Sequence, residues 1–411
     1  MRLKQDRGDF RDKRYYSRMI YTFDDVEYIL YSITFLQDGY GDISKLFILS
    51  PKGMQTLEAE GNVPLNDKLI KAVTLRSQML NNEIYIFDSG MWYKDRSLFE
   101  TVQKSTWDDV ILDPKTKASI IGDITAFFNN QSLYTEYNVP WKRGIILHGP
   151  PGNGKTITIK ALMREVDRLE KDSIPSLYVK SLNCDMGDEY SVRTIFRQAR
   201  QNAPCLLVFE DLDSLVTDKV RSYFLNEVDG LESNDGILMI GSTNHLGKLD
   251  PAIAKRPSRF DRKYGFELPG TRERLLYAEY WQKKFESNPR IAFDREAAAF
   301  VAELTTEFSY AYMKELFVTS LMIAVGDSSD QIEVDMNEQF KAVDEKADKT
   351  EPASNAKKQV QVEMPDTLKE NKFVQILRKQ AAVLRYEMDS TTKAEEDKEK
   401  EKEKEGQKKD G

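Results

Sequence analysis

A glycine-rich stretch near the middle of the chain decides its fold: Gly149-Pro150-Pro151-Gly152-Asn153-Gly154-Lys155-Thr156. An apolar run over 144–148 precedes it, and a helical pattern over 157–168 follows. In such a strand–loop–helix context, glycines let backbone N–H groups curl round phosphates, and the helix N-terminus adds a positive potential. Lys155 can then reach the β- and γ-phosphates, and the Thr156 hydroxyl can ligate Mg²⁺. The stretch predicts a nucleoside triphosphate site.

Around this stretch, short apolar runs alternate with helical patterns, which is typical of an α/β domain with a parallel sheet. We expect this nucleotide-binding domain to cover residues 106–270. Five runs read as buried strands: Gly144–His148, Ser176–Ser181, Cys205–Phe209, Gly236–Ser242 and Lys263–Leu268. The helices expected between them are Ile157–Arg168, Tyr190–Gln201 and Val220–Val228.

Two of these runs end in polar side chains. The run 205–209 leads into Glu210 and Asp211, and the run 236–242 leads to Asn244. The carboxyl ends of parallel strands meet at one edge of a sheet, so all three side chains should lie beside the phosphate loop. Carboxylates there can hold Mg²⁺ and polarise a water, and Asn244 can orient that water. For Asp213 we expect a helix N-cap instead.

Three arginines follow within seven residues: Arg256, Arg259 and Arg262. An isolated arginine cluster is usually a salt-bridged surface. Here the cluster comes after the phosphate loop, the acidic strand end and the asparagine, which favours a role in stabilising charge on a transferred phosphoryl group.

The order and spacing of these four motifs resemble the AAA ATPase family, within the AAA+ class, over residues 107–325. The resemblance implies a ring oligomer, usually a hexamer, that uses ATP and Mg²⁺. Lys155, Glu210, Asp211 and Asn244 would be catalytic, and Arg256 and Arg259 would act as fingers on ATP held by a neighbouring subunit. Thr156 and Glu210 would hold the metal. The implied nucleotide contacts are Gly149, Pro150, Pro151, Gly152, Asn153, Gly154, Lys155, Thr156, Ile157 and, from the segment Val110–Asp113 that contacts the base, Asp113.

Within the family, the chain looks most similar to the clade of the mitochondrial Rieske-protein translocase, as a soluble fungal-type branch without the membrane anchor. Two departures from the usual family pattern stand out. Glu210 precedes Asp211, where most members have Asp then Glu, and the shorter Asp211 predicts slower hydrolysis. The segment Asn183–Glu189 offers Met186 and no aromatic residue where threading members carry an aromatic pore loop.

Outside the α/β domain, the patterns are more varied. We expect a small α/β N-terminal domain over 1–105, a helical lid over 271–326, a disordered linker over 327–365 and a charged disordered tail over 391–411. The lid helices are expected at Arg272–Phe285, Asp294–Leu304 and Ser309–Val325. An amphipathic helix over 366–390 either packs back on the body or binds a partner.

The amino-acid composition further limits which class of protein this can be. The 411 residues carry 60 basic and 68 acidic side chains, for a net charge of −8, and nucleic-acid binding is not expected. Two cysteines exclude a disulfide framework, and the two cysteines with two histidines argue against a zinc site. No transmembrane segment is expected, and the apolar stretch Met19–Leu36 reads as a helix or a helix–strand pair.

These observations predict an ATP-hydrolysing AAA ring that remodels or translocates an unidentified protein client. The alternative is a nucleotide-gated scaffold or binding module with slow hydrolysis. Asp6, Asp9 and Asp12 argue against a mitochondrial transit peptide, so we expect an intracellular protein, cytoplasmic or nuclear rather than mitochondrial.

Overall fold

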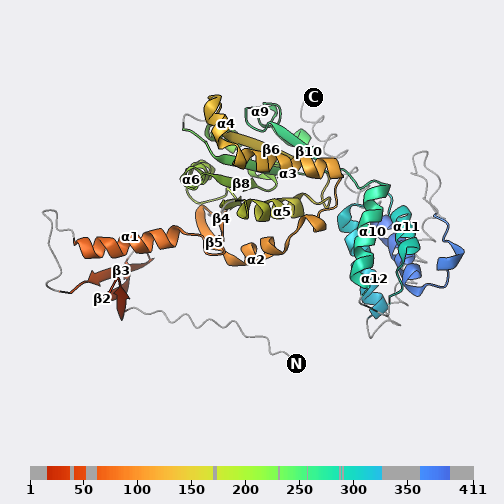
Figure 1. Ribbon diagram of the computed structural model, residues 1–411, viewed down its shortest axis with the longest axis horizontal. Helices are drawn as coiled ribbons and strands as arrows, with labels where there is room; N and C mark the ends of the chain where they lie inside the picture. The colour runs from red at the N-terminus through yellow and green to blue at the C-terminus, as the bar shows by residue number, and fades with distance from the viewer. Residues whose placement is uncertain are drawn as a thin grey trace, which may run out of the picture. The chain divides into compact units, whose positions relative to one another are not determined.

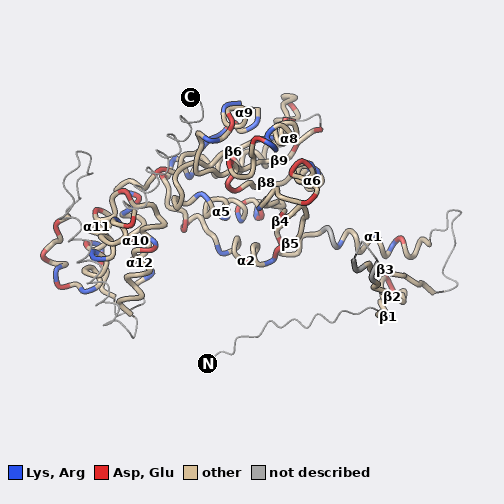
Figure 2. The backbone as a smooth tube through the Cα atoms, turned by 180° about the vertical axis from the view of Figure 1, so that it is seen from behind, with Lys and Arg blue, Asp and Glu red and all other residues tan. Residues whose placement is uncertain are grey.

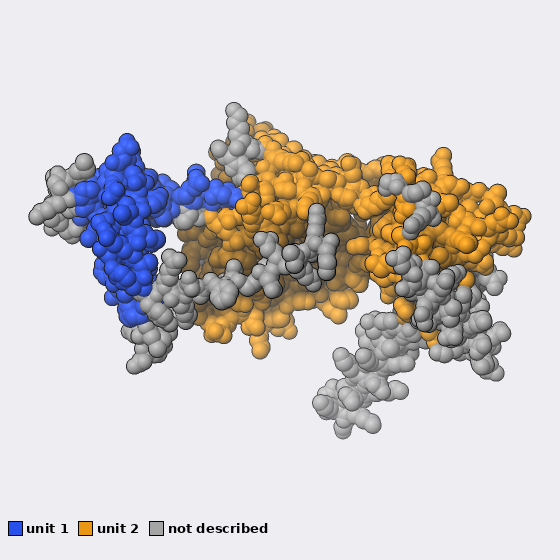
Figure 3. Space-filling model, turned by 90° about the horizontal axis from the view of Figure 1, so that it is seen from below, with its two compact units in different colours: residues 1–81 blue, residues 82–411 orange. Residues whose placement is uncertain are grey.

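The computed structural model describes residues 16–37, 41–51, 63–169, 174–229, 232–256, 258–286, 288, 291–325 and 362–388. The chain divides into two compact units, Met1–Asn81 and Asn82–Gly411 (Figure 3). Most of the expected linker and the whole of the expected tail lie outside the described residues.

The first unit contains a three-stranded antiparallel sheet and one helix. Its elements are β1 (Tyr16–Phe23), β2 (Val26–Gln37), β3 (Gly41–Leu49) and α1 (Pro64–Gln78). The expectation of a helix within Met19–Leu36 is wrong. Asp24 and Asp25 have φ values of 52° and 60°, and two left-handed residues form the tight turn of a β-hairpin. The helix α1 begins at Pro64, a residue that suits the first turn of a helix because its missing N–H would have no partner there.

The second unit is built on a seven-stranded sheet in the order β10-β6-β9-β8-β7-β4-β5. All neighbouring pairs are parallel except β4 and β5. The five expected parallel strands are confirmed, and two more precede them in the chain. The strands are β4 (Ile84–Asp88), β5 (Met91–Asp95), β6 (Lys142–His148), β7 (Ser176–Val179), β8 (Cys205–Phe209), β9 (Ile237–Thr243) and β10 (Arg262–Gly265).

The first unit ends earlier than the residue 105 that we expected, because β4 pairs with β7 instead of with the N-terminal sheet. Tyr85 lies opposite Leu177, and four of the five residues of β4 are buried, as in an inner strand of a parallel sheet. Ser89 and Gly90, both at positive φ, form the two-residue turn into β5.

Helices cover both faces of this sheet (Figure 1). On one face, α2, α3 and α5 pack their apolar residues against alternate positions of the strands. On the other face, Phe196 of α6 and Phe224 of α8 surround Phe209 of β8. The helices are α2 (Arg96–Lys104), the short η1 (Trp107–Asp109), α3 (Pro114–Asn129), α4 (Gln131–Glu136), α5 (Lys155–Asp167), α6 (Asp188–Gln201), α7 (Leu212–Leu215), α8 (Asp218–Asp229), the short η2 (Leu246–Lys248) and α9 (Pro251–Ala254).

The expected lid helices are confirmed as α10 (Thr271–Phe285), α11 (Arg295–Leu304) and α12 (Tyr310–Val325). Asp294 caps α11 by accepting a hydrogen bond from the Ala297 N–H. After η3 (Asp366–Leu368), a further helix over 372–388 packs onto the same apolar cluster, and Leu377 at its centre is fully buried. Of the two alternatives for this segment, the structure shows the packed one. Among the described helices, none combines the length and apolar character needed to cross a bilayer.

Candidate active site

The predicted site residues follow three neighbouring strands. In the sheet, β9 lies between β6 and β8, with His148 opposite Thr243 and Phe209 opposite Gly241. The phosphate loop therefore starts at the same sheet edge as the residues that follow Phe209 and Thr243. The amide of Gly149 donates a hydrogen bond to the Thr243 carbonyl at 3.3 Å, which joins the loop to the end of β9.

The conformation of the phosphate loop requires glycine at two positions that meet other parts of the chain. Gly149 has φ of +144°, and a Cβ atom there would lie 2.2 Å from the Phe266 carbonyl oxygen. Gly152 has φ of +77°, and its Cβ would lie 2.6 Å from that of Ala311. The loop leads into α5, whose first residue is Lys155, so the free N–H groups at the N-terminus of this helix can bind an anion at the loop.

Lys155 is buried and lies folded over the loop. Its Nζ donates to the carbonyl oxygens of Gly149 at 2.7 Å and Pro150 at 3.0 Å. Burial lowers the pKa of Lys155, while the charges of Asp211 and Asp213 oppose that shift. The negative charges of Asp211 and Asp213 thus act on Lys155.

The other predicted residues of the loop differ in exposure. Thr156 is exposed in the first turn of α5, and Ile157 is half-buried. Asn153 is buried and donates from Nδ2 to the Phe266 carbonyl at 3.4 Å, so it braces the loop against the chain after β10. Its predicted contact with the nucleotide stays a prediction.

Glu210 has one bonded and one free carboxylate oxygen. Oε2 accepts a 2.5 Å hydrogen bond from the hydroxyl of Tyr178 on β7. Oε1 is buried and has no hydrogen-bond partner among the described residues. A buried carboxylate oxygen without a donor fits a cation or its bound water, because oxygen ligands are those that Mg²⁺ prefers. Burial, together with Glu210, raises the pKa of Tyr178, which keeps its proton as the donor.

Asp211 and Asp213 are held through the end of β9. The amide of Asp211, at φ of 51°, donates to the Ser242 hydroxyl at 3.2 Å, and the carboxylate of Asp211 is exposed. Asp213 accepts from the Thr243 hydroxyl at 2.7 Å. The expected N-cap role of Asp213 is therefore wrong, because Asp211 occupies the residue before α7 and Asp213 lies inside its first turn. Asn244 follows β9 directly and is half-buried.

The arginines lie in three different environments. Arg259 is buried and bonds Asp229 at 2.6 and 2.8 Å and the Ala252 carbonyl at 2.5 Å. Arg256 is exposed just after α9, where Figure 2 shows basic positions, and forms no ion pair with any residue in the described ranges. The position of Arg259 does not agree with its predicted role as a second finger, because its guanidinium already binds within its own chain.

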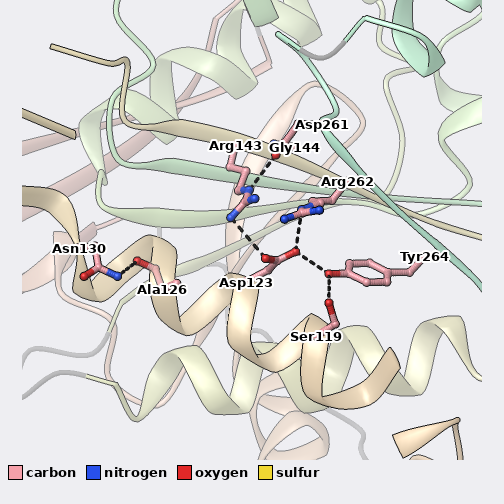
Figure 4. A network of polar contacts seen from close by, with 9 residues as sticks. All are labelled: Ser119, Asp123, Ala126, Asn130, Arg143, Gly144, Asp261, Arg262 and Tyr264. Carbon is pink, nitrogen blue, oxygen red and sulfur yellow. Dashed lines mark hydrogen bonds and ion pairs between the residues drawn. The ribbon is translucent and has the colours of Figure 1, made fainter. Parts of the chain in front are cut away.

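The third arginine belongs to a polar network at the edge of the sheet (Figure 4). Arg262 lies 3.2 Å from Asp123, which is also 3.6 Å from Arg143. Arg143 bonds Asp261 at 2.9 Å. The network ties Asp261 and the start of β10 to α3 and β6.

On the side expected to contact the base, Asp113 caps α3. Its carboxylate accepts from the Thr116 amide at 3.0 Å, and this bond is the main cause of the lowered pKa of Asp113. Its carboxylate is therefore already engaged, and the predicted nucleotide contact stays a prediction. The lid reaches the loop directly, because the Ala311 amide donates to the Gly152 carbonyl at 3.0 Å.

Two residues of this site were not predicted from the sequence. In the sequence, Tyr178 lies within one apolar strand and Ser242 lies near the end of another, so neither stands out as a site residue. The sequence does contain one signal for Tyr178: its hydroxyl lies one residue before the end of β7, which is the strand next to β8, the strand that leads into Glu210. Its partner becomes visible only through the register that sets Tyr178 opposite Val208, two residues before Glu210.

Comparison with known proteins agrees with this geometry. Residues 145–268 match the model of the ATPase family associated with various cellular activities (AAA). The chain is 35% identical to the ribosome biogenesis ATPase RIX7 of Saccharomyces cerevisiae over 193 residues, 44% of this chain and 22% of that protein. It is 30% identical to the proteasome-activating nucleotidase of Aeropyrum pernix over 234 residues, 52% of this chain and 53% of that protein.

A third relative is the peroxisomal ATPase PEX6 of Candida glabrata, 30% identical over 267 residues, 61% of this chain and 24% of that protein. The chain thus spans between about a fifth and a half of the length of these curated relatives. The resemblance to the Rieske-protein translocase clade stays a prediction. Over its residues 145–268, the chain thus contains a domain that matches the AAA ATPase family.

Proposed function

We propose that this chain binds ATP with Mg²⁺ and hydrolyses it to ADP and phosphate, in a site that a neighbouring copy completes. One observation carries the proposal: the phosphate loop, Glu210, Asp211 and Asn244 follow neighbouring strands at one sheet edge, while Arg256 is exposed and unpaired among the described residues. The names of the three relatives, two ATPases and a nucleotidase, support the same activity.

Each residue has a role that follows from its position. Lys155 would exchange its two carbonyl partners for phosphate oxygens, which is favourable because those oxygens carry charge. The hydroxyl of Thr156 and the free oxygen of Glu210 would hold Mg²⁺. When bound, the metal neutralises charge on the phosphates. Asp211 would accept the proton of the attacking water, and Asn244 would orient that water.

A ring of copies is the assembly that this site favours. Arg256 lies in a separate segment after α9 and points to no acid of its own chain in the described ranges. A finger supplied by a neighbour implies head-to-tail contacts, and such contacts close into rings. We propose a homo-oligomer, with six subunits as the resemblance implies.

The output of such a ring would be the remodelling or translocation of a protein client. The relatives are named for ribosome biogenesis, proteasome activation and the peroxisome. The contact between Ala311 and the phosphate loop supports coupling between nucleotide and lid, because the lid helix starts on the loop itself.

Two variants of the full chain test the site. Lys155→Ala should lose ATP binding in isothermal titration calorimetry. Asp211→Asn should bind ATP and hardly turn it over. Asp213→Asn is the matched control, because that carboxylate is engaged by Thr243 and we give it no role in proton transfer. If Lys155→Ala and Asp211→Asn both hydrolyse ATP like the parent, the assignment is wrong.

The second candidate is a nucleotide-gated scaffold with slow hydrolysis. It is favoured by the short Asp211 in the position of the base, and by the exposed Met186 in place of a pore aromatic. Steady-state turnover of the purified chain distinguishes the two. A scaffold would bind ATP, stay loaded over many minutes and respond little to added client proteins, whereas a remodelling ring would turn over continuously.

A further inference from the structure

We propose that Tyr178 is a positioning residue of the active site, which clamps Glu210 so that one carboxylate oxygen faces the divalent cation. The inference rests on the proposed function and deepens it. It assigns a role to a side chain that the four sequence motifs do not include.

The contact is specific in its geometry. Tyr178 lies on β7, next to the strand β8 that leads into Glu210, and its hydroxyl is 2.5 Å from Oε2. The second oxygen, Oε1, is buried and has no partner among the described residues. Oε2 therefore accepts a hydrogen bond from the neighbouring strand, and Oε1 remains available to a ligand.

The residue order of this chain explains why a clamp is useful. The metal-side acid is a glutamate here, one methylene longer than the aspartate expected from the family resemblance. The angle of its terminal torsion has a broad, roughly two-fold distribution, so the carboxylate of an unrestrained glutamate would adopt several orientations. A hydrogen bond to one oxygen removes that freedom in the folded protein, before any cation binds.

The chemistry of the donor matters as well. A phenol donates a hydrogen bond without bringing a positive charge, whereas Arg or Lys in the same place would neutralise part of the carboxylate. The hydroxyl of Tyr178 thus adds no positive charge that would repel a cation. Partners of metal ligands commonly tune metal affinity, by about 10- to 100-fold when they are removed.

The chain offers a matched control in Tyr264. Its hydroxyl is also 2.5 Å from a carboxylate, Oδ2 of Asp123, and it lies in the same sheet on β10 (Figure 4). Asp123 is bound by Arg143 and Arg262 and has no role in the proposed site. Tyr264→Phe therefore removes an equivalent bond at a place where no cation is expected.

The experiment compares Tyr178→Phe and Tyr264→Phe in the full chain, each in the Asp211→Asn background so that ATP persists. Binding of ATP is measured by calorimetry in EDTA and in Mg²⁺, and binding of Mn²⁺ to the ATP complex by electron paramagnetic resonance. For Tyr178→Phe we expect unchanged ATP affinity in EDTA and about 10-fold weaker Mn²⁺ binding. For Tyr264→Phe we expect neither value to change.

Each outcome has a clear meaning. Mn²⁺ affinity in Tyr178→Phe equal to that of the background, with a normal circular dichroism spectrum, would overturn the clamp. If the background itself fails to bind ATP, the proposed function fails instead. If Tyr178→Phe does not fold, Glu210→Asp tests the same contact from the other side. Shortening the acid withdraws it from the hydroxyl and should also weaken Mn²⁺ binding, and unchanged binding would refute the clamp.

Discussion

Arg259 and Asp229 form an ion pair within one chain, with 2.6 Å between guanidinium nitrogen and carboxylate oxygen, and only 7% of the arginine side chain is exposed. Arg256, three residues earlier, is exposed and binds no acid in the described part of the chain. We therefore expect the two arginines to differ in role: Arg259 holds its segment to α8 through Asp229, and Arg256 would reach a neighbouring subunit.

Alanine substitution should separate these roles. Arg256→Ala should leave the melting temperature unchanged and lower turnover steeply, since arginine fingers contribute about 10³–10⁵ in rate. Arg259→Ala should lower stability by about 2 kcal/mol, because Asp229 and the Ala252 carbonyl lose a charged donor. Thermal unfolding and ATP turnover measure the two effects.

Mixed rings provide the control for Arg256. Rings that mix Arg256→Ala subunits with Lys155→Ala subunits should regain part of the turnover that each variant alone lacks, because the intact site of the first variant can receive the intact arginine of the second. If no turnover returns in mixed rings, the arginine acts within its own chain.

Gly149→Ala should abolish ATP binding. A Cβ at this position would lie 2.2 Å from the Phe266 carbonyl oxygen, so the loop must move away from β10. Gly122→Ala is the matched control. It has nothing within 4 Å of its new Cβ and lies inside α3, where alanine should add up to about 1 kcal/mol of stability. Calorimetry with ATP and thermal unfolding distinguish the two, and normal binding by Gly149→Ala would contradict the loop geometry.

Leu377→Ala should destabilise the lid by about 2–5 kcal/mol. Leu377 is fully buried in the cluster that joins helix 372–388 to the lid, and its truncation leaves a cavity. Met322→Ala, on α12 with 65% of the residue exposed, should change stability by no more than about 0.5 kcal/mol. Urea unfolding provides the comparison. Equal effects would mean that the C-terminal helix does not hold the lid together.

His148 should make stability depend on pH. Burial lowers its pKa below the usual 6.5, with Lys263 and Lys155 adding to the shift and Glu267 opposing it. Between the folded pKa and 6.5, the unfolded chain binds more protons, so stability is complete above pH 6.5 and falls as the pH drops through that interval. His148→Asn should flatten this part of the pH profile of stability, measured by urea unfolding.

Much of the site could be predicted because its parts are local. A glycine-rich loop between strand and helix has one common use, and the ends of parallel strands share an edge, so the sequence predicts Lys155, Glu210 and Asn244 at one site. The pairing of Arg259 with Asp229 spans thirty residues of chain. This ion pair depends on how α8 packs against the segment after α9, and no local sequence pattern predicts it.

The same limit explains the misplaced boundaries of the N-terminal part. The apolar run of β4 can be seen in the sequence, but β7, the strand with which it pairs, is about ninety residues away along the chain. The hairpin of β1 and β2 was missed because Asp24 and Asp25 read as interruptions of an apolar helix. Their left-handed backbone makes them a turn instead.

The lid helix α12 starts on the phosphate loop through Ala311 and carries Phe317, which stacks on Trp281 with 5.2 Å between ring centroids and 17° between planes. A rearrangement of the loop would thus be passed along α12 to this aromatic pair. The indole emission of Trp281, isolated by replacing the other three tryptophans, would then give an intrinsic optical record of nucleotide exchange in real time, without any attached dye.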